Sequence, residues 1–396
     1  MLLRPALMFF ILVYSMSVHA EKSEWSGYFS GEWRSFLHSP SDDEQHGDSS
    51  SLSAQAEYYR EWNNGKQSLR FTSFLRIDGR DSSRSHFDVR ELNWTTVHDK
   101  WELTAGIGKV FWGVTESQHL VDIINQTDLV ESIDGEEKLG QLMLKLSLVR
   151  DWGNLDLFLL PGFRERTFPS RVGRLRTSAA VAVNQAEYDS SQARDHIDTA
   201  IRWSKSVGDW DIGLSHFSGT SREPSFRVSQ DKGRTVLIPV YTTIDQTALD
   251  LQATKDDWLW KLEIVSRSGQ GDRYTAATGG FEYTLYGINE SSVDLGLIAE
   301  YLYDDRDNLA TTAFENDVFL GARLGFNDEA SSELLAGVII DVNDSSRVMS
   351  VEASRRLGNN WKVSLEGRFF SNIAELNSLS SFKNDDFVQL ELAWYF

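Results

Sequence analysis

Two segments of opposite charge are the first candidates for chemistry in this sequence. Residues 109–139 carry seven carboxylates against two lysines, whereas residues 162–177 hold five arginines and one glutamate. Arginines that face an acidic constriction would set a transverse field, and rings of charge select ions in this way. Alternatively, the arginines bind phosphates of lipopolysaccharide, because a planar guanidinium matches phosphate as well as carboxylate. Both interpretations stay open. The candidate acids of the first segment are Glu116, Asp122, Asp128 and Glu131.

A hydroxyl and an imidazole two residues apart form a further candidate. In an extended strand His216 and Ser218 share one face, and a base beside a hydroxyl is the minimum for nucleophilic catalysis. Such pairs are common by chance, and the sequence contains no HExxH, GxSxG or Walker-type motif. We therefore predict no catalytic residue, no metal site and no cofactor, and keep a hydrolase that uses this pair as an alternative.

The composition excludes several classes of protein. The 396 residues include 59 acidic and 39 basic side chains, for a formal net charge of −20, and no cysteine. A chain without cysteine has no disulfide framework and no thiolate metal cluster. The negative charge argues against a nucleic-acid partner, because such binding needs a basic face that displaces counterions from phosphates.

The first twenty residues have the pattern of a secretory signal peptide. Arg4 supplies a short positive region, residues 7–16 are apolar, and Val18 and Ala20 are small residues at the −3 and −1 positions of a cleavage site. We predict a signal peptide at 1–20 and a single mature domain at 21–396.

Apolar residues recur at every second position along the rest of the chain. Leu390, Leu392, Trp394 and Phe396 alternate with Glu391, Ala393 and Tyr395, for example. Successive strand side chains point to opposite faces, so each segment has one apolar and one mixed face. The segments run about 10 to 12 residues, the length of tilted membrane strands. The mixed faces carry more charges than a dry sandwich core tolerates, whereas a watery lumen holds them.

We therefore predict an all-β fold, a transmembrane up-and-down antiparallel β-barrel of about eighteen strands, with sixteen as the runner-up. Barrels of this size leave an aqueous channel, whereas eight strands fill with side chains. The predicted strands are 25–37, 52–62, 67–79, 84–97, 101–108, 140–149, 154–161, 195–206, 209–219, 244–255, 258–268, 278–286, 292–303, 316–326, 333–342, 347–357, 361–371 and 386–396.

The predicted connections alternate between short and mostly longer ones, as in outer-membrane barrels with short periplasmic turns and long external loops. The longer ones include 109–139, 162–194 and 220–243. Segment 109–139 mixes carboxylates with short apolar stretches, so we expect it to fold into the barrel and line its constriction. Some arginines lie at those alternate strand positions whose side chains face the lumen. These candidate pore-lining cations are Arg70, Arg76, Arg202, Arg267, Arg323 and Arg368.

The signal peptide, the barrel strands that continue to the last residue and the terminal aromatic residues of 392–396 resemble Gram-negative outer-membrane porins. The resemblance implies a passive diffusion channel for small hydrophilic solutes or ions in the bacterial outer membrane. It also implies outer-membrane lipids, lipopolysaccharide and the barrel-assembly machinery as partners, and leaves a homo-oligomer open. The alternatives are a structural or adhesive barrel and a lipid hydrolase. His216 and Ser218 resemble the pair of outer-membrane phospholipase A, but Gly219 and Thr220 replace the Asn-Gly that follows the serine there.

Overall fold

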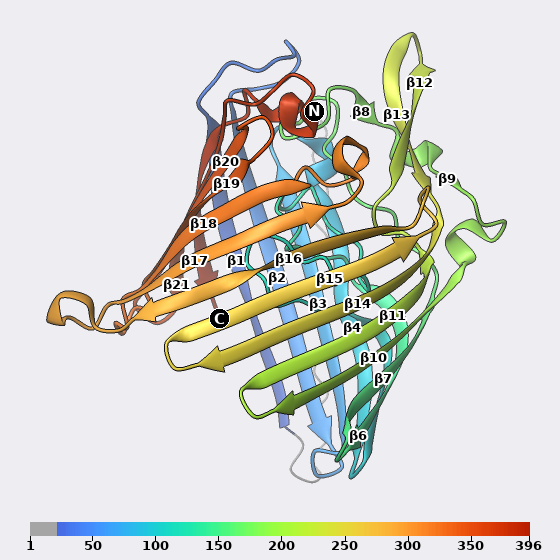
Figure 1. Cartoon of the computed structure of the whole chain (residues 1–396), viewed down its shortest axis with the longest axis vertical. Helices are drawn as coiled ribbons and strands as arrows, with labels where there is room; N and C mark the ends of the chain where they lie inside the picture. The colour runs from blue at the N-terminus through green and yellow to red at the C-terminus, as the bar shows by residue number, and fades with distance from the viewer. Residues whose placement is uncertain (1–21) are drawn as a thin grey trace, which may run out of the picture.

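The computed structural model describes residues 22–396, so the predicted signal peptide at 1–20 lies outside the described residues. Eighteen antiparallel strands close into one barrel (Figure 1). They are β1 (Lys22–Phe36), β2 (Asp48–Trp62), β3 (Gln67–Asp78), β4 (His86–His98), β5 (Trp101–Gly108), β6 (Gln141–Arg150), β7 (Gly153–Pro161), β10 (Ile197–Val207), β11 (Trp210–Thr220), β14 (Thr243–Lys255), β15 (Trp258–Ser268), β16 (Tyr274–Leu285), β17 (Asp294–Asp304), β18 (Asn316–Gly325), β19 (Glu333–Asp341), β20 (Arg347–Leu357), β21 (Trp361–Ser371) and β22 (Phe387–Tyr395). The predicted fold and the strand count of eighteen are confirmed.

Within residues 22–396 the helices are six short 3-10 turns: η1 (Ser82–Arg84), η2 (Val183–Gln185), η3 (Ala193–Asp195), η4 (Ile288–Glu290), η5 (Asp307–Leu309) and η6 (Ser378–Phe382). None of the helices in this part of the chain has the length and apolar character needed to cross a membrane.

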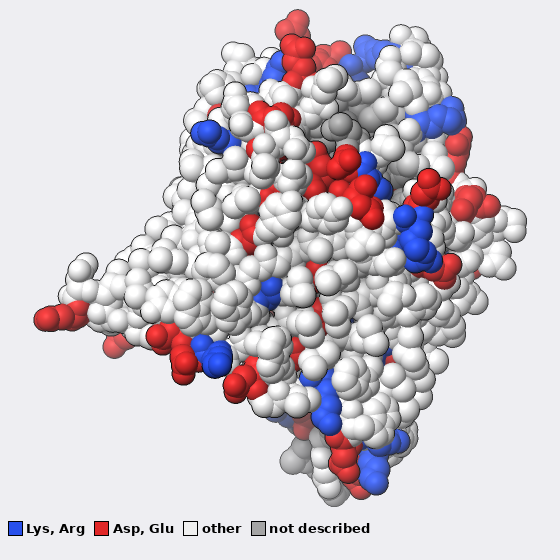
Figure 2. All heavy atoms as spheres, viewed as in Figure 1, with Lys and Arg blue, Asp and Glu red and all other residues white. Residues whose placement is uncertain are grey.

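The alternating pattern places apolar side chains on the outside of the barrel. On β6, Leu142 and Leu144 are exposed, whereas Met143 between them is buried on the lumenal side. Figure 2 shows the consequence on one face: most charged side chains lie toward the two rims, and the band between them carries few. A charged group in contact with lipid would lose its hydration without compensation, which is strongly unfavourable. The charges of the strands therefore face the lumen.

The structure contains a small external sheet that was not predicted from the sequence. Segments 162–194 and 220–243, predicted as loops, contain β8 (Ala180–Val181), β9 (Glu187–Tyr188), β12 (Ser225–Asp231) and β13 (Arg234–Tyr241). β12 and β13 form a hairpin that projects from the rim of the barrel (Figure 1). Its tight turn uses Lys232 and Gly233, both with positive φ, as two-residue hairpin turns require. β8 and β9 are only two residues long and pair in parallel with β13, so they leave no local sequence signal.

The barrel closes where the first strand meets the last. β1 pairs with β2 on one side and with β22 on the other. At the seam the Gly27 amide donates to the Phe396 carbonyl (3.3 Å), and the Phe396 amide donates back to the Gly27 carbonyl (3.1 Å). A Cβ on Gly27 would lie 2.2 Å from the backbone oxygen of Gln55, so only glycine lets the strands approach this closely.

We expect Gly27→Ala to force β1 away from β2 beside the seam, because the new methyl group meets the Gln55 backbone of β2 rather than a flexible side chain. The variant should lose most of the heat-modifiable folded band in electrophoresis without boiling. Gly31→Ala is the matched control on the same strand, since its Cβ would meet only Leu52 Cδ2 at 3.7 Å. Equal folded fractions for the two variants would contradict the role of Gly27.

Candidate functional site: the lumenal loop and the constriction

The connection between β5 and β6, residues 109–140, folds into the lumen and is held there by buried wall carboxylates. Glu263 on β15 accepts hydrogen bonds from the backbone amides of Val114 (2.7 Å), Thr115 (3.1 Å) and Val121 (3.1 Å), and from the Thr115 hydroxyl (2.8 Å). The Glu263 side chain is fully buried. A buried carboxylate is costly unless hydrogen bonds satisfy it, so the loop and this glutamate stabilise each other.

A second glutamate extends this anchor along the wall. Glu300 on β17 accepts from the amides of Glu116 (2.8 Å) and Ser117 (2.9 Å) and from the Ser117 hydroxyl (2.6 Å). Gly113, just before this stretch, has φ +148°, and a Cβ there would lie 2.9 Å from His119 Nδ1 and 3.1 Å from Glu263 Oε1. The chain therefore needs glycine where it approaches the buried carboxylate.

Ion pairs hold the far end of the loop on the opposite wall. Arg76 on β3 contacts Glu131 (2.9 Å) and also Glu32 on β1 (3.0 Å). Arg90 on β4 contacts Asp128 at 2.8 Å. These side chains are buried, so each charge depends on its partner for compensation.

Apolar side chains of the loop pack on the inner wall between these anchors. Val121, Ile123 and Ile124 are buried together with Trp112. The wall residues of this cluster come from several strands: Met143, Phe158, Leu160, Ala200, Phe217, Ile244, Ala248, Val265, Tyr274 and Ala276. The burial of this stretch removes water from one side of the barrel interior and adds to the free energy that fixes the loop.

The four candidate acids of the loop all have basic partners. Glu116 contacts Arg323 (2.6 Å) and Lys261 (3.5 Å), and Asp122 contacts Lys138 of the same loop (3.1 Å). Asp128 and Glu131 make the wall contacts described above. Asp122 borders an open cavity, whereas Asp128 is fully enclosed.

The six candidate cations fall into two groups. Arg76, Arg323 and Arg368 pair directly with acids of the loop, the last of them with Asp134 at 2.7 Å. The other three pair elsewhere: Arg70 lies 4.0 Å from Glu91, Arg202 makes a two-pronged contact with Asp250, and Arg267 contacts Glu223 at 3.0 Å.

The arginine segment of residues 162–177 serves mainly to join external loops. Arg171, Arg174 and Arg176 pair with Glu44, Asp385 and Asp42 respectively. Arg164 reaches Asp88 on β4 at 2.8 Å. Arg166 borders a cavity of the lumen. Arg166 thus faces the lumen beside the acidic loop, and three arginines pair with carboxylates of other external loops.

Among the cavities of the described chain, an inner one lies against β18 to β22, and an outer one is lined by the loop and by β15, β16, β17, β19, β20 and β21. The inner one, near the short turns, has a volume of about 410 Å³ and is lined from β18, β19, β20, β21 and β22. The outer one, of about 360 Å³, reaches Ile339, Val348 and Phe370 on the upper parts of β19, β20 and β21. Asp134 of the loop lines both cavities. Its ion pair with Arg368, which lines the outer cavity, therefore lies between the two cavities.

The two cavities carry opposite charge. The outer cavity is lined by six Lys and Arg side chains and four Asp and Glu side chains. The inner cavity is lined by two Lys and Arg side chains and five Asp and Glu side chains. The outer basic residues are Lys138, Arg166, Arg222, Arg267, Arg306 and Arg368. The inner acids are Asp134, Glu333, Glu352, Glu366 and Glu391. A solute that crosses the barrel along this wall would meet a positive region and then a negative one.

Sequence reasoning missed three residues that position the loop. Glu263 and Glu300 have lumenal parity, as do Lys261 and Arg267 on β15, so the sequence places them in the lumen but does not mark them as anchors. Asp134 belongs to the acidic loop, but nothing local distinguishes it from Glu136 or Glu137. Its contact with Arg368 joins residues 234 positions apart in sequence.

The His216 and Ser218 pair lies on the outer face of β11. The His216 ring nitrogen Nδ1 is within hydrogen-bond distance of the Thr247 hydroxyl on β14 (3.0 Å), and its Nε2 lies 3.9 Å from Asp245. The strongest contact of the imidazole in the described chain is thus with the neighbouring strand rather than with Ser218.

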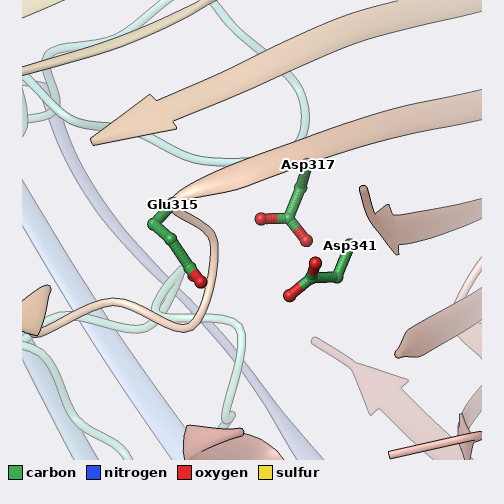
Figure 3. A group of neighbouring side chains, drawn as sticks. All are labelled: Glu315, Asp317 and Asp341. Carbon is green, nitrogen blue, oxygen red and sulfur yellow. The ribbon is translucent and has the colours of Figure 1, made fainter. Parts of the chain in front are cut away.

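Three carboxylates at the external end of β18 and β19 are close enough to share a cation. One carboxylate oxygen from each of Glu315, Asp317 and Asp341 lies within 4.8 Å of the other two (Figure 3). Asp341, however, accepts hydrogen bonds from the amides of Asn343 (2.6 Å) and Asp344 (3.0 Å). These bonds shape the turn between β19 and β20, so we assign Asp341 to the turn rather than to a metal site.

No family model and no curated protein matches this sequence. Similar solved structures include a mutant of the Rh. blastica porin, 12% identical with a TM-score of 0.45, aligned over 95% of this chain and 100% of the other. Another is a loop L8 deletion mutant of OmpT, an outer membrane protein of Vibrio cholerae, 9% identical with a TM-score of 0.48, over 96% and 100%.

The closed eighteen-stranded barrel, its apolar outer belt and its charged lumen define an outer-membrane porin-like architecture. The exposed aromatic and aliphatic side chains of the strands fit a lipid environment, which places the protein in the bacterial outer membrane.

We expect Glu263→Ala to release the loop from the wall. The change leaves the amides of Val114, Thr115 and Val121 without their acceptor, and each buried unsatisfied donor costs about 1–3 kcal/mol. Trypsin should then cleave the folded protein in detergent faster at Lys109 or Lys138, as followed by mass spectrometry. Glu24→Ala removes an exposed carboxylate and is the control. Unchanged cleavage in Glu263→Ala would contradict the anchor.

His119 of the lumenal loop should make the stability of the protein depend on pH. Burial alone would lower the pKa of His119, but a hydrogen bond with Glu136 (2.8 Å) and the Glu263 carboxylate 3.9 Å away raise it to about 10. A raised pKa stabilises the fold fully below the ordinary value of about 6.5, and this contribution is lost as pH rises toward 10. The melting temperature should therefore fall more steeply from pH 6.5 to 10 in the parent than in His119→Gln. Equal slopes would contradict the assignment.

Proposed function

We propose that the protein is a passive diffusion channel for small hydrophilic solutes or ions across the outer membrane. The observation that carries the proposal is the pair of lumenal cavities that are both lined by Asp134, the ion-pair partner of Arg368. Eighteen strands enclose more space than side chains fill, and the loop, which is anchored on β3, β4, β15 and β17, leaves open space beside β18 to β22. The passage then runs along β18 to β22.

In this proposal the residues of the loop have two roles. Asp128 and Glu131 hold the loop on Arg90 and Arg76, so they position the constriction rather than touch solute. Asp134 and Arg368 narrow the passage.

Other lumenal charges set the field along the path. Glu116 and Asp122 contribute negative charge beside the passage, and Arg323 and Arg267 contribute positive charge. Arg70 and Arg202 line the wall away from the two cavities. Charged groups along a water-filled pore set its ion selectivity.

We expect Asp134→Asn to raise single-channel conductance in planar bilayers and to shift selectivity toward anions. The change removes a negative charge from the lining of both cavities and leaves the Arg368 guanidinium less compensated, although Glu352 and Glu366 still contact it. Reversal potentials in a KCl gradient measure the shift.

Asp43→Asn is the matched control, because Asp43 is an exposed carboxylate of the external loop before β2. It should change neither conductance nor reversal potential.

Deletion of residues 118–134 tests the loop as a whole and should raise conductance further. A parent protein that forms no channel, or a deletion that leaves conductance unchanged, would overturn the proposal.

A further inference from the structure

The outer cavity contains one basic side chain that has no acidic partner. Of its six Lys and Arg residues, five contact a carboxylate: Lys138 contacts Asp122, Arg222 contacts Asp198, Arg267 contacts Glu223, Arg306 contacts Asp304 and Arg368 contacts Asp134. Arg166 makes no such ion pair within residues 22–396. Its Nε donates only a long hydrogen bond to Gln126 Oε1 (3.4 Å).

The position of Arg166 is fixed by its surroundings. Its backbone amide donates to the Tyr241 hydroxyl (3.1 Å), and Tyr241 is fully buried against Tyr188 and Phe163. Burial lowers the pKa of Arg166, as expected for a cation that has left water without a close counter-ion. The backbone of Arg166 is therefore fixed beside the cavity, and its half-buried side chain lines the cavity.

The nearby carboxylate Glu223 acts on Arg166 electrostatically but makes no ion pair with it in the described part of the chain, and its Oε2 is held by other partners. It contacts Arg267 Nη1 at 3.0 Å and accepts from the Thr311 hydroxyl at 2.9 Å. The planar fork of Arg166 thus remains available for an anion, and carboxylates match it with two parallel hydrogen bonds.

Apolar side chains line another part of the same cavity. Phe314, Ile339, Val348, Phe370 and Phe382 border it from β19, β20, β21 and the external loops. The rings of Phe370 and Phe382 are stacked, with centroids 5.7 Å apart. The volume of about 360 Å³ falls within the range of small-molecule sites. A ligand that uses both surfaces must combine an anionic group with an apolar body.

We propose that the outer cavity is a binding site for small monocarboxylates with an apolar or aromatic body, whose carboxylate binds Arg166. This inference rests on the proposed channel function and names the class of solute that the channel retains on its path. The acids of the inner cavity then favour release, because an anion that passes Arg368 meets like charge.

The test measures block of single-channel KCl current by four probes added on the side of the long loops. Benzoate has both the carboxylate and the apolar body, acetate has only the former, benzyl alcohol lacks the charge, and phenyl phosphate replaces the carboxylate. Benzoate should block at a concentration at least tenfold lower than acetate, and benzyl alcohol should not block. Stronger block by phenyl phosphate than by benzoate would overturn the assignment to carboxylates.

Three variants assign the block to the cavity. Arg166→Gln should weaken benzoate block about tenfold or more, the factor expected for a lost charge-assisted hydrogen bond, and Arg166→Lys should recover part of it. Phe382→Ala should weaken benzoate more than acetate, which keeps the proposal testable if Arg166→Gln fails to fold. Arg171→Gln, in the same external segment but outside the cavity lining, is the control and should leave both conductance and block unchanged.

The outcomes separate this inference from the channel proposal. One contradicting result is a parent that conducts KCl while benzoate and acetate block it equally. Another is block of Arg166→Gln by benzoate that is as strong as block of the parent. Either result would overturn the proposed carboxylate site and leave the channel proposal intact. If the parent conducts no current, the channel proposal itself fails.

Discussion

The arrangement of the lumen depends on buried wall carboxylates that accept hydrogen bonds from the backbone of the inserted loop. A loop inside a barrel must satisfy its own amides without the partners that a strand has. Glu263 and Glu300 provide these acceptors, and the hydrogen bonds from the loop amides offset the desolvation of the two buried carboxylates. Neither the loop nor the glutamates would be stable in place alone, so the constriction and the wall form one structural unit.

The placement of this loop decides where solute can pass. Anchors on β15 and β17 at one end and on β3 and β4 at the other hold the loop across the lumen. Open space remains in an inner cavity along β18 to β22 and in an outer cavity nearer the long loops, and Asp134 lines both. The net charge of −20 therefore says little about the path, because the outer cavity has a basic excess and the inner one an acidic excess.

The external segments stabilise the mouth of the barrel by the same kind of pairing. Arg174 binds Asp385 (2.6 Å) and Arg176 binds Asp42 (3.0 Å), which connects the loop after β7 to the loops before β2 and β22. The hairpin of β12 and β13 adds Tyr241, whose hydroxyl fixes the backbone at Arg166. The arginines of one segment thus have two uses, since three join loops and one faces the cavity.

The sequence by itself determined the barrel, its eighteen strands and the direction of its side chains, because alternation with period two is a local property that each strand records independently. It also identified Glu116, Glu131, Arg76, Arg323 and Arg368 as lumenal charges from parity and loop composition. Only the tertiary structure decided which charges meet. Asp134 and Arg368 are far apart in sequence, as are Val114 and Glu263, and their contacts depend on how the closed barrel places strands across the lumen. The short strands β8 and β9 likewise exist only because β13 offers them an edge, so no local pattern could predict them.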